Sequence, residues 1–107
     1  MIEIQFSPEA ISDLKEIKAY IAEELCNEQA ATRTTADILK RIRTLSAFPE
    51  SGASLSSIIE MTTNYRFLVC GNYTAFYRFE NDVIYIARIL YGSRNFMQIL
   101  FGDSFSN

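Results

Sequence analysis

The chain contains no histidine among its 107 residues. Ser–His and Cys–His catalysis both depend on an imidazole base, and histidine-ligated metal sites depend on imidazole nitrogens. The sequence excludes these classes, so any chemistry must use arginine, tyrosine, lysine or carboxylate side chains. We expect neither a bound metal nor a cofactor.

Cysteine is scarce as well. Cys26 and Cys70 lie in apolar stretches without Cys-x-x-Cys spacing, which predicts two buried reduced thiols rather than a disulfide. No stretch approaches the roughly 20 apolar residues of a membrane helix. Residues 1–6 alternate in polarity and lack the basic start and apolar run of a signal peptide. We therefore expect a cytoplasmic protein with no membrane contact.

Positive charge is in the minority. The formal net charge is −3 and the pI is about 4.9, which argues against a protein that simply coats nucleic acid. Residues 1–60 carry six basic and ten acidic side chains, a difference of −4, whereas residues 61–107 carry four arginines and three acids, a difference of +1. The charge distribution therefore still allows a local basic patch on the C-terminal part of the chain.

The composition is otherwise that of an ordinary folded protein, with 49% hydrophobic and 21% charged residues. At this length one core is expected, so residues 1–107 should form a single domain.

The first half of the chain predicts a strand followed by two helices. Residues 2–6 alternate as a half-buried strand does, and Ser7-Pro8-Glu9 supplies an N-cap hydroxyl, a proline at the first helical position and an acid near the positive helix end. Apolar residues then recur at spacings of three and four through residue 25, with Asp13 among the residues expected to face solvent. A second helix is expected from about residue 28 to 47, packed against the first as an antiparallel helical hairpin.

Proline and glycine in residues 48–52 end the second helix. Residues 53–63 are rich in serine and threonine, which predicts a loop or a short helical turn. Residues 96–101 are strongly apolar and are expected to form a short C-terminal helix or tail against the core.

The remaining segments predict a three-stranded antiparallel meander with tight turns at Gly71-Asn72 and Asn81-Asp82. With these turns, Arg66 opposes Tyr77, and Ala75 opposes Arg88. Because opposed residues share a face, one face should carry both arginines and Tyr77. The opposite face, which is expected to receive the helical hairpin, should carry Phe67, Val69, Thr74, Phe76, Ala87 and Ile89.

The order of these elements, together with several short strings, resembles the RelE/ParE superfamily of toxins from type II toxin–antitoxin systems. The strings are Phe6-Ser7-Pro8-Glu9-Ala10, Asp13-Leu14, Phe48-Pro49-Glu50-Ser51-Gly52, Tyr65-Arg66, Gly71-Asn72-Tyr73, Phe76-Tyr77 and Arg88-Ile89-Leu90-Tyr91-Gly92-Ser93-Arg94. The resemblance implies an α+β toxin that inhibits growth and is neutralised by a cognate antitoxin, as a homodimer or a toxin–antitoxin hetero-oligomer.

The resemblance implies two alternative targets. RelE-like members cut mRNA in the ribosome, and ParE-like members inhibit DNA gyrase; the tail of this chain looks more like the ParE side. For a RelE-like nuclease the matching catalytic positions are Arg66, Arg88 and Tyr91. Many relatives have histidine where Tyr91 stands, and RelE-like members tend to be rich in lysine near the site, whereas this chain has no lysine after Lys40.

The residues themselves allow a ribonuclease or a binding protein. As a nuclease, the chain would use Arg66 and Arg88 to clamp the scissile phosphate, but a tyrosine of ordinary pKa near 10 is a poor base. As a binding protein, it would present arginines beside aromatics, the usual composition of protein hot spots. The residues expected to contact a target or antitoxin are Arg66, Tyr77, Arg88, Tyr91, Arg94 and Phe96. A non-toxic relative that acts only by binding is a third possibility, and a purely structural role for the sheet arginines is a further alternative.

Overall fold

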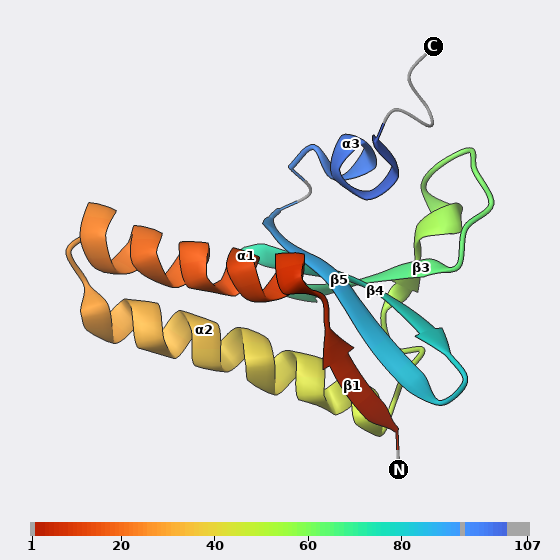
Figure 1. The fold of residues 1–107 in the computed structure, drawn as a ribbon, viewed down its shortest axis with the longest axis horizontal. Helices are drawn as coiled ribbons and strands as arrows, with labels where there is room; N and C mark the ends of the chain where they lie inside the picture. The colour runs from red at the N-terminus through yellow and green to blue at the C-terminus, as the bar shows by residue number, and fades with distance from the viewer. Residues whose placement is uncertain (1, 93, 103–107) are drawn as a thin grey trace.

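The computed structural model describes residues 2–92 and 94–102, which form an α+β fold as predicted. The N-terminal strand, the helical hairpin, the meander and the short C-terminal helix are all present (Figure 1). Their bounds are β1 Glu3–Phe6, α1 Pro8–Ala19 with a π-helical extension Tyr20–Glu24, α2 Glu28–Arg43 with a 3-10 turn Thr44–Ser46, β2 Ala53–Ser54, a 3-10 turn Leu55–Ser57, β3 Tyr65–Cys70, β4 Tyr73–Glu80, β5 Val83–Tyr91 and α3 Phe96–Phe101.

The strands form one five-stranded sheet in the order β1-β5-β4-β3-β2. The meander is its centre, while β1 joins β5 in parallel and the two-residue strand β2 joins β3. The edge strand β2 lies in the segment that was expected to be a loop. Both predicted turns are present, and Asn81 and Asp82 have positive φ values of 51° and 61°, as a tight hairpin turn requires.

A β-bulge shifts the register of β4 against β5. Tyr77 pairs with Ile86 as predicted, but the next pair is Phe76 with Arg88, so Ala87 is the extra residue. The predicted pairing of Ala75 with Arg88 is wrong, because Ala75 pairs with Ile89. The bulge begins where β1 ends, since the last β1–β5 pair joins Phe6 and Ile86.

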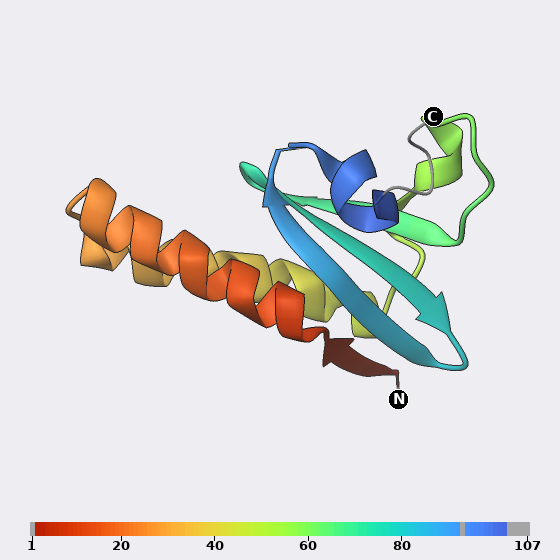
Figure 2. The same cartoon turned by 45° about the horizontal axis from the view of Figure 1, so that its top comes forward.

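The helical hairpin covers the face of the sheet opposite to the one expected. Leu68, Ala75, Tyr77 and Ile86 are buried with Ile38 and Ile42 of α2 in the larger core. A smaller core on the other face joins Phe76 and Leu90 to α3, which lies across the sheet from the hairpin (Figure 2). The prediction failed because both faces are apolar, so alternation alone did not identify the face that the helices cover.

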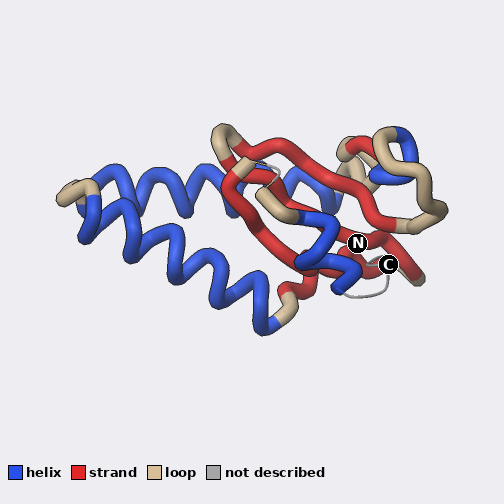
Figure 3. Tube along the Cα trace, turned by 90° about the horizontal axis from the view of Figure 1, so that it is seen from above, coloured by secondary structure: helices blue, strands red, loops and turns tan. Residues whose placement is uncertain are grey.

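Side-chain caps fix the starts of both long helices. The Ser7 hydroxyl accepts from the Ala10 amide at 2.9 Å and donates to the Ala87 carbonyl at 2.7 Å, which ties α1 to the bulge in β5. Asn27 accepts from the Ala30 amide at 2.9 Å and starts α2. The hairpin then projects beyond one end of the sheet, as the view from above shows (Figure 3).

Among the described residues, no helix is both long enough and apolar enough to span a membrane. Both cysteines are free, and Cys70 is buried as expected. Cys26 is exposed, so the prediction of its burial is wrong; it lies with φ of 52° in the short link between the helices.

Candidate functional site

A groove of about 1,410 Å³ separates the projecting end of the hairpin from the end of the sheet that carries the β3–β4 turn. We call it the hairpin groove. Its walls come from α1, its π-helical extension, α2, and the ends of β3, β4 and β5, with Arg94 and Ile99 beyond. Tyr20, Leu25 and Tyr91 line it and are 55%, 58% and 60% exposed, so the groove offers apolar surface to a partner.

Arginines and tyrosines lie together in the hairpin groove. Arg41 donates from Nε to the Val69 carbonyl at 3.3 Å, and Arg94 is exposed. The rings of Tyr73 and Tyr91 meet edge to face with centroids 5.5 Å apart. Burial raises the pKa of Tyr73, and the neighbouring Tyr91 and Tyr20 raise it further. The Tyr73 phenol therefore stays protonated to higher pH than an ordinary tyrosine.

Arg88 forms a two-pronged ion pair with Asp13 at the floor of the hairpin groove. Both guanidinium–carboxylate distances are 2.8 Å, and the same carboxylate accepts the Ile89 amide at 2.9 Å. The hydrogen bonds that Arg88 donates to the Asp13 carboxylate raise the pKa of Arg88 above its ordinary value. Since β1 ends at Phe6, Asp13 takes the place of a strand partner for Ile89. The ion pair thus joins α1 to β5.

The expectation that Asp13 faces solvent is wrong, because it is only 6% exposed. Its spacing contained the signal: it follows buried Ala10 by three residues and precedes Leu14 and Ile17 on the same helical stripe. An acid within an apolar stripe predicts a buried partner of opposite charge.

Arg66 and Tyr77 hold the loop of residues 48–52 against the sheet. Arg66 donates to the carbonyls of Gly52 and Glu50 at 3.0 and 3.1 Å. The Tyr77 hydroxyl donates to the Pro49 carbonyl at 2.8 Å and accepts from the Gly52 amide at 3.0 Å. Tyr77 is fully buried, so it has no surface with which to contact a ligand.

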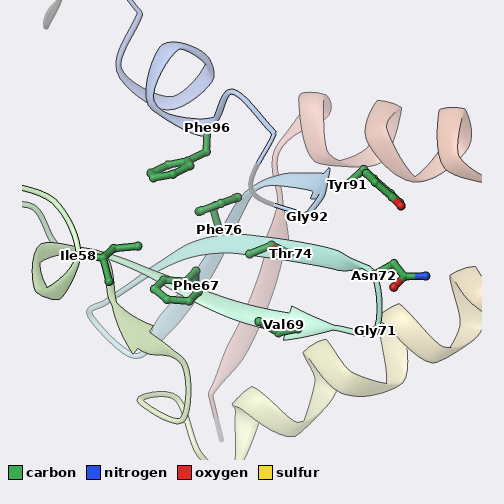
Figure 4. A pocket seen from close by; sticks show the side chains of 10 residues that line it. All are labelled: Ile58, Phe67, Val69, Gly71, Asn72, Thr74, Phe76, Tyr91, Gly92 and Phe96. Carbon is green, nitrogen blue, oxygen red and sulfur yellow. The ribbon is translucent and has the colours of Figure 1, made fainter.

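A second hollow, of about 470 Å³, lies on the face of the sheet away from the hairpin (Figure 4). We call it the sheet pocket. Phe76 and Phe96 stack at its side with ring centroids 5.3 Å apart, while Tyr91 extends away from them. Its lining consists of Ile58, Phe67, Val69, Gly71, Asn72, Thr74, Phe76, Tyr91, Gly92 and Phe96. Among these described residues there is no carboxylate, amine or guanidinium, and Tyr91 is the one titratable side chain.

The predicted site residues therefore fall into three groups. Tyr91 lines both hollows, Arg94 lines the hairpin groove and Phe96 lines the sheet pocket. Arg88 lines the groove but is engaged by Asp13, and Arg66 and Tyr77 belong to the loop contact. Arg66 and Arg88 thus bind separate elements of the fold. The sequence analysis did not identify the groove residues Tyr20, Leu25 and Arg41. Across the described ranges, no cluster of three or more cysteine, aspartate and glutamate side chains could hold a metal.

Comparison with known proteins gives one family and one fold. The model of the "ParE toxin of type II toxin-antitoxin system, parDE" matches residues 4–96. No functionally curated protein matches the chain by sequence.

Several solved structures share the fold, among them the following two. A chain of a chromosomal ParDE toxin–antitoxin system from P. aeruginosa is 22% identical with a TM-score of 0.73, and the match covers 86% of this chain and 97% of that one. A chain of the YoeB–YefM toxin–antitoxin complex from Staphylococcus aureus is 16% identical with a TM-score of 0.53, covering 85% and 97%.

Proposed function

The chain belongs to the ParE toxin family of type II toxin–antitoxin systems, and from this premise we propose that it arrests growth by binding DNA gyrase, without chemistry of its own. The observation that carries the proposal is the uncharged lining of the sheet pocket. Cleaving RNA through its 2′-hydroxyl needs a group that accepts a proton and cations that stabilise the phosphorane. The lining of the sheet pocket has no carboxylate or imidazole to accept the proton and no amine or guanidinium to stabilise the charge.

The state of the sheet arginines supports the same proposal. A phosphate clamp needs guanidinium donors that are free to bind, whereas Arg88 donates two hydrogen bonds to Asp13 and Arg66 donates two to backbone carbonyls. Releasing Arg88 would leave Asp13 buried without its counterion, which is costly. These contacts support a structural role for both arginines.

The hairpin groove is the surface we assign to the cognate antitoxin. Its exposed Tyr20, Leu25 and Tyr91 suit apolar anchors, and Arg41 and Arg94 suit acidic side chains of the same partner. A type II antitoxin is a protein, so an amphipathic segment with acids beside its apolar residues fits this surface.

The target is tested with purified toxin in two reactions, gyrase supercoiling of plasmid DNA and translation of a defined mRNA by ribosomes. We expect supercoiling to stop while the mRNA stays intact. Cleavage of the mRNA at codon positions with normal supercoiling would instead establish an mRNA interferase. No effect in either reaction would identify a non-toxic relative that acts only by binding.

The antitoxin surface is tested with Leu25→Asp in the hairpin groove. Placing a charge in an apolar contact should weaken binding of the cognate antitoxin at least tenfold, measured by calorimetry. Phe48→Asp is the matched control, because Phe48 is 66% exposed and lies outside the groove. Equal losses from both variants would refute the assignment of the groove.

A further inference from the structure

The outer face of α2 carries a row of exposed basic residues. Arg33, Lys40 and Arg43 are all exposed and lie at i, i+7 and i+10. Helical periodicity places them within one face, opposite the buried Ala31, Ile38 and Ile42. At a rise of about 1.5 Å per residue the row spans about 15 Å. We call it the α2 basic row.

Within the described residues, the α2 basic row has no ion-pair partner. The ion pairs there join Arg78 to Glu80 and Arg88 to Asp13. The sequence suggests a basic patch on the C-terminal strands, but the three strand arginines are engaged by Glu80, Asp13 and the carbonyls of residues 50 and 52. Among the basic residues of the strands and α2, those that remain available to a ligand therefore lie on α2, while Lys15, Lys18 and Arg94 are exposed elsewhere.

The charge of the molecule is distributed unevenly around α2. This helix carries four basic residues and two acids, a net +2, so the rest of the −3 chain carries −5. The acids of the helix are Glu28 in its first turn and Asp37, which follows Arg33 by four residues and precedes Lys40 by three, at the edge of the row toward the hairpin groove. Helix-dipole stabilisation accounts for bases in the last turn but not for Arg33.

We propose that the α2 basic row binds the phosphate backbone of duplex DNA. The row places three cations along about 15 Å of helix, and one strand of a duplex carries about four phosphates over that length, at one about every 3.4 Å. Neither the hairpin groove nor the sheet pocket includes a residue of the row, and α2 carries no aromatic side chain that would select a base, so the contact is independent of sequence. This inference goes beyond gyrase binding and does not depend on it, although gyrase would bring DNA to the toxin.

The test compares two double charge reversals of equal size and spacing. Lys40→Glu with Arg43→Glu alters the α2 basic row, and Lys15→Glu with Lys18→Glu alters exposed positions of α1 with the same i, i+3 spacing. Both change the net charge by −4. Binding of a short labelled DNA duplex to full-length toxin is measured by fluorescence anisotropy at several salt concentrations, with circular dichroism to verify folding.

We expect the α2 reversal to weaken binding at least tenfold at low salt and the α1 reversal to weaken it much less. The salt dependence should become shallower by about 0.9 in log–log slope for each phosphate that the variant no longer neutralises. If the α2 reversal does not fold, Lys40→Ala with Arg43→Ala replaces it, and this variant should also weaken DNA binding more than the α1 reversal does. Equal weakening by both reversals would overturn the proposal, and so would tighter binding of a polyglutamate of matched charge, which would identify an acidic protein as the partner.

The gyrase proposal can fail separately from this one. If the wild type does not inhibit supercoiling but its DNA binding depends on α2, only the gyrase proposal is refuted. If the wild type inhibits supercoiling but the α2 reversal leaves DNA binding unchanged, only the proposed α2 contact is refuted.

Discussion

At the scale of single residues, Tyr77, which was expected to contact a ligand, is fully buried between the sheet and the loop of residues 48–52. Its hydroxyl bonds to Pro49 and Gly52, and a side chain at Gly52 would approach that hydroxyl to 2.6 Å. Gly52 is required there because the loop lies so close to the sheet. Tyr77→Phe leaves the Gly52 amide buried without a partner, so we expect a loss of about 1–3 kcal/mol in the free energy of unfolding.

Chemical denaturation measures this loss. Tyr85→Phe is the control, because Tyr85 uses its ring against Arg78, 5.5 Å from the guanidinium carbon, and the substitution keeps the ring. That control should change stability by less than about 0.5 kcal/mol. Equal changes in the two variants would contradict the role given to the Tyr77 hydroxyl.

Cys70 gives a prediction about pH. Burial raises the pKa of its thiol from 9.0 to about 11, against smaller opposing effects of Arg41 and the Ala75 backbone. Below pH 9 the thiol is protonated in both states, so it adds no pH dependence; between pH 9 and 11 the unfolded chain loses the proton first, and stability falls.

Denaturation at about pH 8 and about pH 10.5 tests this effect. Cys70→Ala should lose less stability between the two conditions than the wild type, while Cys26→Ala, at the exposed cysteine, should behave as the wild type. Tyrosine ionisation affects all three proteins alike. The idea fails if the three lose the same amount.

At the scale of elements, the sequence predicted the helices, central strands and turns because their signals are local. Caps at Ser7 and Asn27 and the turn at Asn81-Asp82 act within a few residues. Two of the failures concern distant partners. The bulge at Ala87 depends on packing between separate elements, and the pair of Asp13 with Arg88 joins residues 75 positions apart, which short-range periodicity does not report.

The lack of information on distant contacts also explains the errors in the predicted site. Arginines inside strands suggest a ligand-binding face. Arg66 instead bonds to the loop of residues 48–52, and Arg88 bonds to Asp13 of α1. Tyr91, Arg94 and Phe96 line the two hollows because they end or follow the last strand; their role in binding stays a prediction. The groove residues of the helices were missed because the sequence does not distinguish an exposed wall of a groove from an ordinary solvated face.

The start of α1 gives the prediction at this scale. Ser7 caps the helix and also donates to Ala87 in the bulge, whereas Asn27 only caps α2. Ser7→Ala should therefore cost about 2 kcal/mol and Asn27→Ala about 1 kcal/mol of unfolding free energy. Thermal and chemical denaturation of both variants measure the difference. A larger loss from Asn27→Ala would show that the bond to Ala87 adds no stability.

At the scale of the whole molecule, the sheet separates two cores of unequal strength. The larger core, under the hairpin, contains fully buried side chains from α2 and the three central strands. The smaller core depends on α3, a six-residue helix with no fully buried residue and no side-chain cap. A helix that short is not stable alone, so its order depends on contacts such as the stack of Phe96 on Phe76.

We therefore expect the two cores to unfold differently. Ile42→Ala should cost about 2–5 kcal/mol in the global transition, because Ile42 is fully buried in the larger core. Phe96→Ala should release α3 with a much smaller global loss, because the larger core does not contain Phe96. Amide hydrogen exchange distinguishes these outcomes, since exchange in α3 should accelerate while the amides of β4 stay protected. Loss of protection in β4 on Phe96→Ala would show instead that the two cores fold as one unit.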